Sequence, residues 1–312
     1  MSEKPSPPIP FFKGLMLGVL LTFVLLRLIP LIQSRVFRRQ SGSTQNTQPL
    51  ASPAIDTTAI TKNVLPNEVT LGITFGDVVV KMIKSGAIDK NKFSALYEGR
   101  GGLPQTEKQL LESWTSEKVT VSADNAQILL NLLWPLGIAN KTNVLSDGPM
   151  GTQYKNEVGN FASTGGWTLG KVPGGQLYNK YEFVKLTTEQ EKKVSEIAQN
   201  IYRPCCGNST YFPDCNHGAA MLGFLYLAVT QGISEEEIYK EALILNSYWF
   251  PQTYSELAIY FQTKKNTAWK DVNPQEILGV NYSSAQGYKT INQELTTAGL
   301  LPKVQGGGGC GV

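Results

Sequence analysis

Apolar and polar positions divide the chain into stretches of different character. An apolar run from Gly14 to Ile32 is followed by a polar stretch rich in serine, threonine and glutamine, and farther on apolar residues recur at helical spacing. The pattern predicts a mainly α fold. The predicted parts are a disordered tail at 1–10, a transmembrane anchor at 11–33, a flexible linker at 34–67, a compact all-helical domain at 68–303 and a glycine-rich tail at 304–312.

The apolar run is long enough to cross a membrane. Its nineteen residues contain one charge, Arg27, and at about 1.5 Å per residue they span roughly 28 Å. A cleaved signal peptide is the alternative, but no cleavage site of small residues follows the run. We therefore expect a single-pass membrane protein whose residues 14–32 contact the lipid bilayer.

The flanks of this run give opposite indications of orientation. Three arginines after it (35, 38 and 39) outnumber two lysines before it (4 and 13), which places the domain in the cytoplasm by the positive-inside rule. The almost uncharged linker and the charge-poor domain instead resemble the stalks and domains found outside bacterial membranes. On this second ground we expect an extracytoplasmic domain.

Local signals divide the domain into successive helices, and the sequence contains few convincing strands. The helical pattern begins at Val69, and its expected boundaries follow from glycine, proline and capping side chains. Expected ends are Gly86, Gly99 and Pro251; expected starts are Ser122, Thr187 or Thr188, Ser234, Asn273 with Pro274, and Ala285.

Helical spacing stops between residues 143 and 181, where a glycine-rich loop is expected. Within it, residues 165–171 fit the GxxxxGK spacing of a phosphate loop, but Val172 replaces the hydroxyl that binds Mg²⁺ and Pro173 follows. We therefore interpret the segment as an ordered loop that packs Trp167. A loop of this length is often functional and could cover a site elsewhere in the domain.

The charge balance excludes nucleic acid as an expected partner. The whole chain has 28 basic and 25 acidic residues, but residues 1–40 hold six of the basic residues and one of the acidic ones. The remainder therefore has 22 basic and 24 acidic residues, a net charge of −2. Such a domain has no basic excess to neutralise phosphates.

Candidate chemistry is concentrated in YRPCCGNSTYFPDCNHGAAMLG, residues 202–223. Three of the four cysteines and the only histidine lie there within thirteen positions: Cys205, Cys206, Cys215 and His217. Thiolates and imidazole suit zinc or Cu(I), so these four residues are the predicted ligands of a zinc or copper ion. Adjacent cysteines need a bent backbone to share one metal ion.

The local context of the last two ligands supports this interpretation. Cys215 and His217 are two residues apart and would face the same side of an extended segment. A helix expected to start near Gly218 would favour a thiolate at Cys215 through its N-terminal dipole. Met221 and Cys310 are possible additional ligands.

Several alternatives to a metal site remain open from the sequence. Cys205 and Cys206 could be a thiol–disulfide redox pair, or Cys215 could form a structural disulfide with either of them. The thiols could also be inert buried side chains, and His217 could be only a helix cap. A peptidase-like cysteine is a further alternative, and it has little support because no histidine follows His217.

The cysteine block, together with NFASTGGWTLGK and LNSYWFP, resembles an uncharacterised group of bacterial membrane-anchored proteins. The resemblance covers most of residues 71–288. It implies a membrane anchor and assigns no role to any residue.

Overall fold

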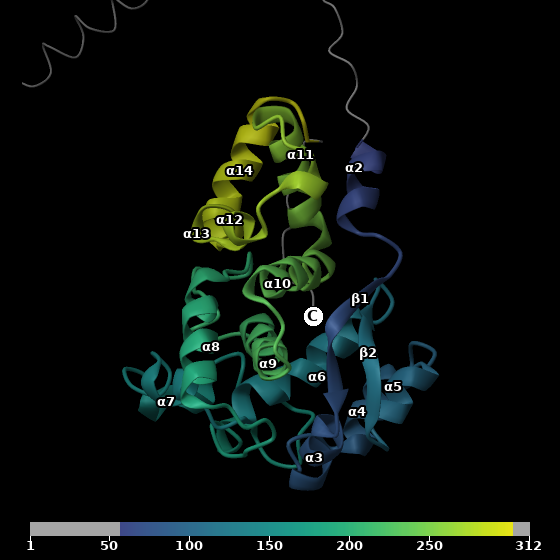
Figure 1. Ribbon diagram of the computed structural model, residues 1–312, viewed down its shortest axis with the longest axis vertical. Coiled ribbons are helices and arrows are strands. Elements are labelled where there is room, and N and C mark those ends of the chain that lie inside the picture. The colour runs from purple at the N-terminus through teal and green to yellow at the C-terminus, as the bar shows by residue number, and fades with distance from the viewer. Residues whose placement is uncertain (1–56, 302–312) are drawn as a thin grey trace, which may run out of the picture. The chain divides into compact units, whose positions relative to one another are not determined.

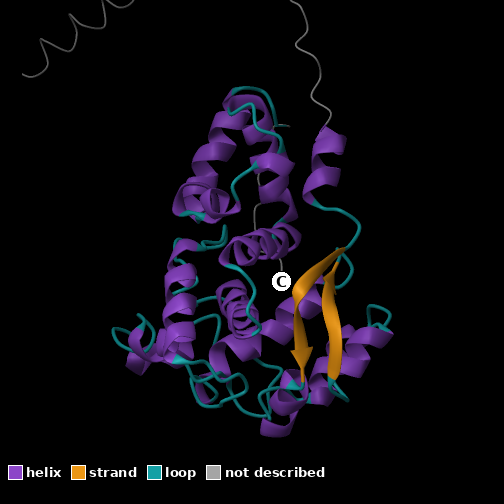
Figure 2. Ribbon diagram, viewed as in Figure 1, coloured by secondary structure: helices purple, strands orange, loops and turns teal. Residues whose placement is uncertain are grey.

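The computed structural model describes residues 57–301, all of which belong to the second of two units, Ile55–Val312. The described part is mainly helical, as predicted, with one small sheet (Figure 2). Its first half contains α2 (Thr57–Val64), β1 (Val69–Gly76), α3 (Val78–Ser85), α4 (Lys90–Glu98), α5 (Gln105–Leu110), β2 (Thr115–Val121), α6 (Ala126–Ala139), α7 (Asn143–Asp147) and the 3₁₀ helices η1 (Lys155–Asn160) and η2 (Gly174–Gln176). Its second half contains α8 (Thr188–Asn200), α9 (Asn216–Thr230), α10 (Glu235–Trp249), α11 (Pro251–Lys264), η3 (Trp269–Asp271), α12 (Pro274–Leu278), α13 (Val280–Ser283) and α14 (Ala285–Thr297).

Capping residues set several boundaries where the sequence predicts them. Thr187 opens α8 with a capping box, in which its side chain accepts a hydrogen bond from the Gln190 backbone and the Gln190 side chain bonds back. Ser234 caps α10, and Pro251 is the first residue of α11. These boundaries are confirmed because each depends on neighbouring residues alone.

The sheet corrects the prediction of an all-helical domain. Val69–Gly76 is strand β1, not the start of a helix, and it pairs antiparallel with β2. Alternate residues of β1 are buried, namely Leu71, Ile73 and Phe75. This period of two is the pattern of a half-buried strand. In Figure 1 the two strands lie side by side along one flank of the domain.

Helix α2 begins inside the segment that the sequence assigns to the linker. It packs against α11, and its last residue, Val64, is buried in the core. The ordered domain therefore begins before residue 68. The predicted anchor, the rest of the linker and the glycine-rich tail with Cys310 lie outside the described residues.

The central packing is between α6 and α9, both buried at nearly every position. A Cβ atom on Gly137 would lie 1.7 Å from the Ala219 carbonyl oxygen, and one on Gly223 would lie 2.2 Å from the Leu133 carbonyl oxygen. The two backbones therefore approach closely through glycine. Helix α6 also continues past Pro135, which the sequence predicts would bend or end it.

Among residues 57–301, no helix is both long and apolar enough to cross a membrane. The predicted span, residues 14–32, lies outside that range, so the anchor stays a prediction.

Candidate metal centre

The segment that carries the cysteines, residues 201–215, joins α8 to α9. Backbone hydrogen bonds hold its first half in place. Tyr202 donates to the Leu278 carbonyl at 2.8 Å, and Thr210 donates to the Ile201 carbonyl at 2.8 Å. The carbonyl of Cys206 accepts from the Ala285 amide at 2.9 Å. The start of α14 and the end of α12 therefore hold the loop that carries Cys205 and Cys206.

Cys215 is the N-cap of the buried helix α9. Its backbone is extended, and its Sγ atom accepts a hydrogen bond from the Gly218 amide at 3.4 Å. The helix starts at Asn216, slightly earlier than predicted, so His217 lies within its first turn. The side chain of Cys215 thus replaces the hydroxyl or carboxylate that usually caps a helix.

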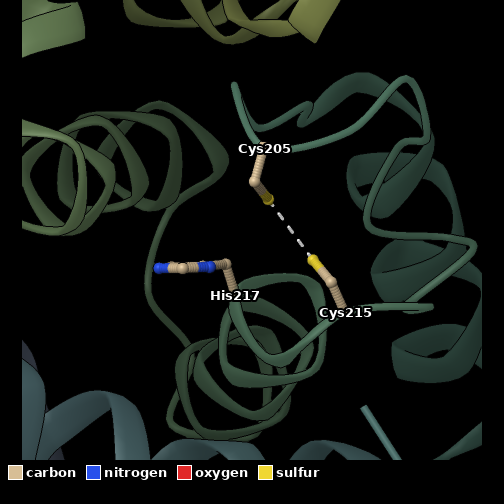
Figure 3. A group of neighbouring side chains, drawn as sticks. All are labelled: Cys205, Cys215 and His217. Carbon is tan, nitrogen blue, oxygen red and sulfur yellow. Dashed lines mark hydrogen bonds between the residues drawn. The ribbon is translucent and has the colours of Figure 1, made fainter. Parts of the chain in front are cut away.

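Three of the four predicted ligands converge. The Sγ atoms of Cys205 and Cys215 are 3.5 Å apart and point toward each other, with His217 beside them (Figure 3). One ligand atom from each of these three residues lies within 4.8 Å of the other two. Cys206 belongs to a second, overlapping group that contains Asp214 and Cys215. The four predicted residues therefore lie close together and could hold a metal ion.

The imidazole of His217 is packed between helices and lacks a hydrogen-bond partner on one nitrogen. Its ring centroid is 4.3 Å from that of Phe250 and 6.0 Å from that of Trp249, at the junction of α10 and α11. Its Nδ1 atom is buried without a hydrogen-bond partner among the described residues. A buried nitrogen of this kind costs free energy unless a further group binds it.

Arg203 lies at the centre of the segment and was not predicted from the sequence. Its side chain is 1% exposed, and its Nε atom donates to the Sγ atom of Cys215 at 3.0 Å. Its terminal nitrogens donate to the carbonyls of Asn208 and Phe212, both at 2.9 Å, and to the carboxylate of Asp214. The guanidinium therefore connects the start of the loop with residues in its middle and at its end.

Two neighbouring residues make room for this arrangement and complete it. A Cβ atom on Gly218 would lie 2.5 Å from Cζ of Arg203, so only glycine lets the guanidinium lie against the first turn of α9. The second oxygen of Asp214 accepts from Nδ2 of Asn208 at 2.8 Å. The only cue to Arg203 in the sequence is its position two residues before a cysteine pair.

The three thiols have different acidities in this setting. Hydrogen bonds from Cys205 and Cys206 hold the pKa of the Cys215 thiol well below its usual range, and the Arg203 charge lowers it further against the opposing effect of burial. Hydrogen bonds to Cys206 and Cys215, together with burial, raise the pKa of Cys205. The pKa of Cys206 is raised to about 11, since the hydrogen bond with Cys205 lowers it less than the contact with Cys215 and burial raise it. Cys215 is therefore the most acidic of the three thiols.

The structure contradicts one alternative and leaves two extra ligands without support. All three described cysteines are free and partly exposed, so the structural disulfide from Cys215, one of the alternatives to a metal site, is absent. Met221 is a buried core residue of α9. Cys310 lies outside the described residues.

The glycine-rich loop packs beside the centre, as the sequence suggests. The Ser163 amide donates to the Asp214 carbonyl at 3.0 Å, and the rings of Phe161 and Phe212 meet edge to face at 5.4 Å. Trp167, expected to be packed by this loop, is buried. The loop therefore supports the backbone just before Cys215.

Comparison of the chain with protein-family models, with curated proteins and with solved structures finds no match. The geometry of the centre is therefore the ground for a functional conclusion.

Proposed function

We propose that the protein is a membrane-anchored binder of one soft or borderline metal ion, of the zinc or copper type. Cys205, Cys215 and His217 are its ligands, and Cys206 lies next to them. The observation that carries the proposal is the convergence of two sulfurs and one imidazole within 4.8 Å, with a buried imidazole nitrogen that lacks a partner.

The separation of the sulfurs supports this assignment. Two thiolates bound at about 2.3 Å to a tetrahedral zinc ion would be about 3.8 Å apart. The Sγ atoms of Cys205 and Cys215 are 3.5 Å apart, so a small rotation of either side chain would make room for the ion.

Charge favours a divalent ion over a monovalent one. Arg203 and Asp214 form an ion pair with opposite charges beside the ligands. Two thiolates and a neutral imidazole then leave two negative charges, which Zn²⁺ balances and Cu⁺ does not. Even a partly buried centre costs less free energy with no net charge than with one. We therefore place zinc before copper.

The fourth coordination position has two protein candidates. Cys206 and Asp214 lie within 4.8 Å of each other and of Cys215. Asp214 already accepts hydrogen bonds from Arg203 and Asn208, whereas the Cys206 sulfur has, apart from the other two thiols, long contacts of 3.8 Å to Asp214 and 4.0 Å to the Asn208 carbonyl. Cys206 is therefore the freer of the two to move onto the metal.

The membrane anchor is the second part of the proposal. The apolar run at residues 14–32 would attach the domain to a bilayer, and the polar linker would separate the two. The low charge of the domain favours the extracytoplasmic side, where a thiol-rich metal site would meet incoming ions.

X-ray absorption at the zinc edge tests the ligand set directly. The full chain, purified in detergent and loaded with zinc, should show two or three sulfur neighbours at about 2.3 Å and at least one nitrogen at about 2.0 Å. His217→Ala should remove imidazole scattering and leave the sulfur shell. A shell of oxygen neighbours alone would contradict the proposal.

A further inference from the structure

We infer that Cys205 and Cys215 are also a dithiol couple that exchanges with disulfide substrates. The sequence suggests the adjacent pair Cys205 and Cys206 for such chemistry, whereas the structure pairs Cys205 with a residue ten positions away. The exchange does not need the metal; only its effect on metal release rests on the proposed function.

The distance between the two sulfurs is the first ground. A disulfide bond is about 2.05 Å long, so the Sγ atoms, now 3.5 Å apart, must approach by about 1.5 Å. In Figure 3 the two side chains already point at each other across this gap. Both residues are partly exposed, which the approach of a small disulfide requires.

The surroundings of Cys215 are the second ground, because they prepare it to attack. Its sulfur accepts N–H groups from Arg203 at 3.0 Å and from Gly218 at 3.4 Å, at the N-terminus of a fifteen-residue helix. A buried cation and a helix N-terminus both stabilise a negative sulfur. Among residues 57–301 no N–H group donates to the sulfur of Cys206, which lies 3.8 Å from a carboxylate oxygen of Asp214.

The exchange proceeds in two steps. The Cys215 thiolate attacks one sulfur of a substrate disulfide RSSR, which forms a mixed disulfide and expels RS⁻. The Cys205 thiol then attacks Sγ of Cys215, its proton leaves with the second fragment as RSH, and the Cys205–Cys215 bond forms. Two protein sulfurs are oxidised and two substrate sulfurs are reduced. Run in reverse, the Cys205–Cys215 disulfide would oxidise two substrate thiols to a disulfide and return both cysteines to thiols.

Disulfide formation and metal binding exclude each other, because both use the same two sulfurs. Oxidation would leave His217 as the single remaining ligand of the proposed set. A centre of this kind would release its metal ion when the surrounding disulfide concentration rises.

Oxidised glutathione tests the couple on the full chain. The protein, in detergent and carrying Cys310→Ser so that the fourth thiol cannot compete, is reduced, freed of metal with a chelator and incubated with the reagent. Remaining thiols are then alkylated, and the chain is cut before Asp214. This cut separates Cys205 and Cys206 from Cys215, so a bond from Cys215 to either of them keeps two peptides joined and a Cys205–Cys206 bond does not. An alkyl label on Cys206 then identifies the bond as Cys205–Cys215.

The expected product is lighter by two hydrogen atoms, and its two peptides stay joined. Cys205→Ser should accumulate one glutathione on Cys215, while Cys206→Ser should behave as the parent. Free thiols after incubation, a bond within the Cys205–Cys206 peptide, or joined peptides with the alkyl label on Cys205 would overturn the inference. Because peptide mapping of the parent alone decides, a variant that misfolds does not weaken the test.

Zinc separates this inference from the proposed function. If zinc binds as proposed, a concentration one hundred times its Kd should slow oxidation about 100-fold. Oxidation without zinc, and no zinc binding by the reduced chain, would sustain the exchange and refute the metal site. Zinc binding by a chain that never forms the Cys205–Cys215 bond would support the metal site and refute the exchange.

Discussion

The Nε atom of Arg203 lies 3.0 Å from the Sγ atom of Cys215, and the arginine is almost completely buried. An arginine that donates to a cysteine sulfur in the interior is stabilised only if that sulfur, or another nearby group, is negative. Burial lowers the pKa of Arg203, and Cys215, Cys206 and Asp214 raise it more, so the guanidinium stays charged. The loop is therefore built around a fixed positive charge that faces a thiolate.

Replacing this arginine should destabilise the domain strongly. Arg203→Met removes one donor each from Asp214, Cys215 and two loop carbonyls, and breaking a buried ion pair on one side costs about 3–5 kcal/mol. Urea unfolding of the full chain in detergent measures the change. Arg100→Met is the matched control, because Arg100 is exposed, and should shift the free energy by about 0.5 kcal/mol or less. Equal small effects at both sites would mean that Arg203 does not organise the loop.

A second prediction concerns the contact of α6 with α9. Gly223→Ala would place a methyl group 2.2 Å from the Leu133 carbonyl oxygen, so the helices must separate. We expect a loss of about 1–3 kcal/mol despite the better helix propensity of alanine. Gly99→Ala is the control, since nothing lies within 4 Å of its added methyl. Thermal unfolding measures both variants. Equal melting temperatures for Gly223→Ala and Gly99→Ala would contradict the close contact between α6 and α9.

Glu241 should make stability depend on pH. It is buried, one carboxylate oxygen accepts from the Gly72 amide, and the other has no hydrogen-bond partner among the described residues. Burial raises its pKa in the folded state, so its favourable contribution is full below the unfolded pKa and is lost as pH rises through the folded pKa. Glu241→Gln should therefore gain stability relative to the parent between pH 4 and pH 8.

The control for this prediction is Glu236, whose pKa is shifted in the opposite direction. Hydrogen bonding and the charge of Lys240 lower the pKa of exposed Glu236, so that its contribution is present at high pH and lost as pH falls. Glu236→Gln should show no gain at pH 8. Melting temperatures across this range for both variants measure the difference, and parallel curves for Glu241→Gln and the parent would refute the prediction.

The predicted anchor gives a prediction outside the described residues. Leu21→Arg combined with Val24→Arg places two charges near the middle of the apolar run, each costing about 2.5–3.5 kcal/mol in a membrane. The double variant should leave the membrane fraction on extraction with alkaline carbonate, and the parent should stay. If the parent and the double variant were both retained in the membrane fraction, or both released from it, residues 14–32 would not be the anchor.

Local chemistry explains which parts of the fold are predictable from the sequence. Thr187, Ser234 and Pro251 set helix boundaries through side chains and backbone groups within a few residues. Strand β1 was missed although its buried residues alternate, because its partner β2 is mostly polar and lies about forty residues away. Strand pairing depends on contacts between distant segments, which no local pattern contains.

In the candidate site, too, the features that depend on nearby residues were predictable and those that depend on the folded loop were not. Clustering along the chain predicted Cys205, Cys206, Cys215 and His217 because soft ligands are rare and were close in sequence. Their pairing was not predictable, since it depends on how Arg203 folds the intervening loop. Arg203 itself has backbone carbonyls among its partners, which are the same at every residue and leave no trace in the sequence.

The metal content of the full chain tests the central claim most directly. Protein in detergent, reduced, offered zinc or Cu(I) and then dialysed, should retain close to one ion per chain by elemental analysis. Cys205→Ser, Cys215→Ser and His217→Ala should each lower that content, and Cys206→Ser should lower it less. Retention should weaken as pH falls, because protons compete for the thiolates and the imidazole. A reduced, folded parent chain that retains neither metal would contradict the account.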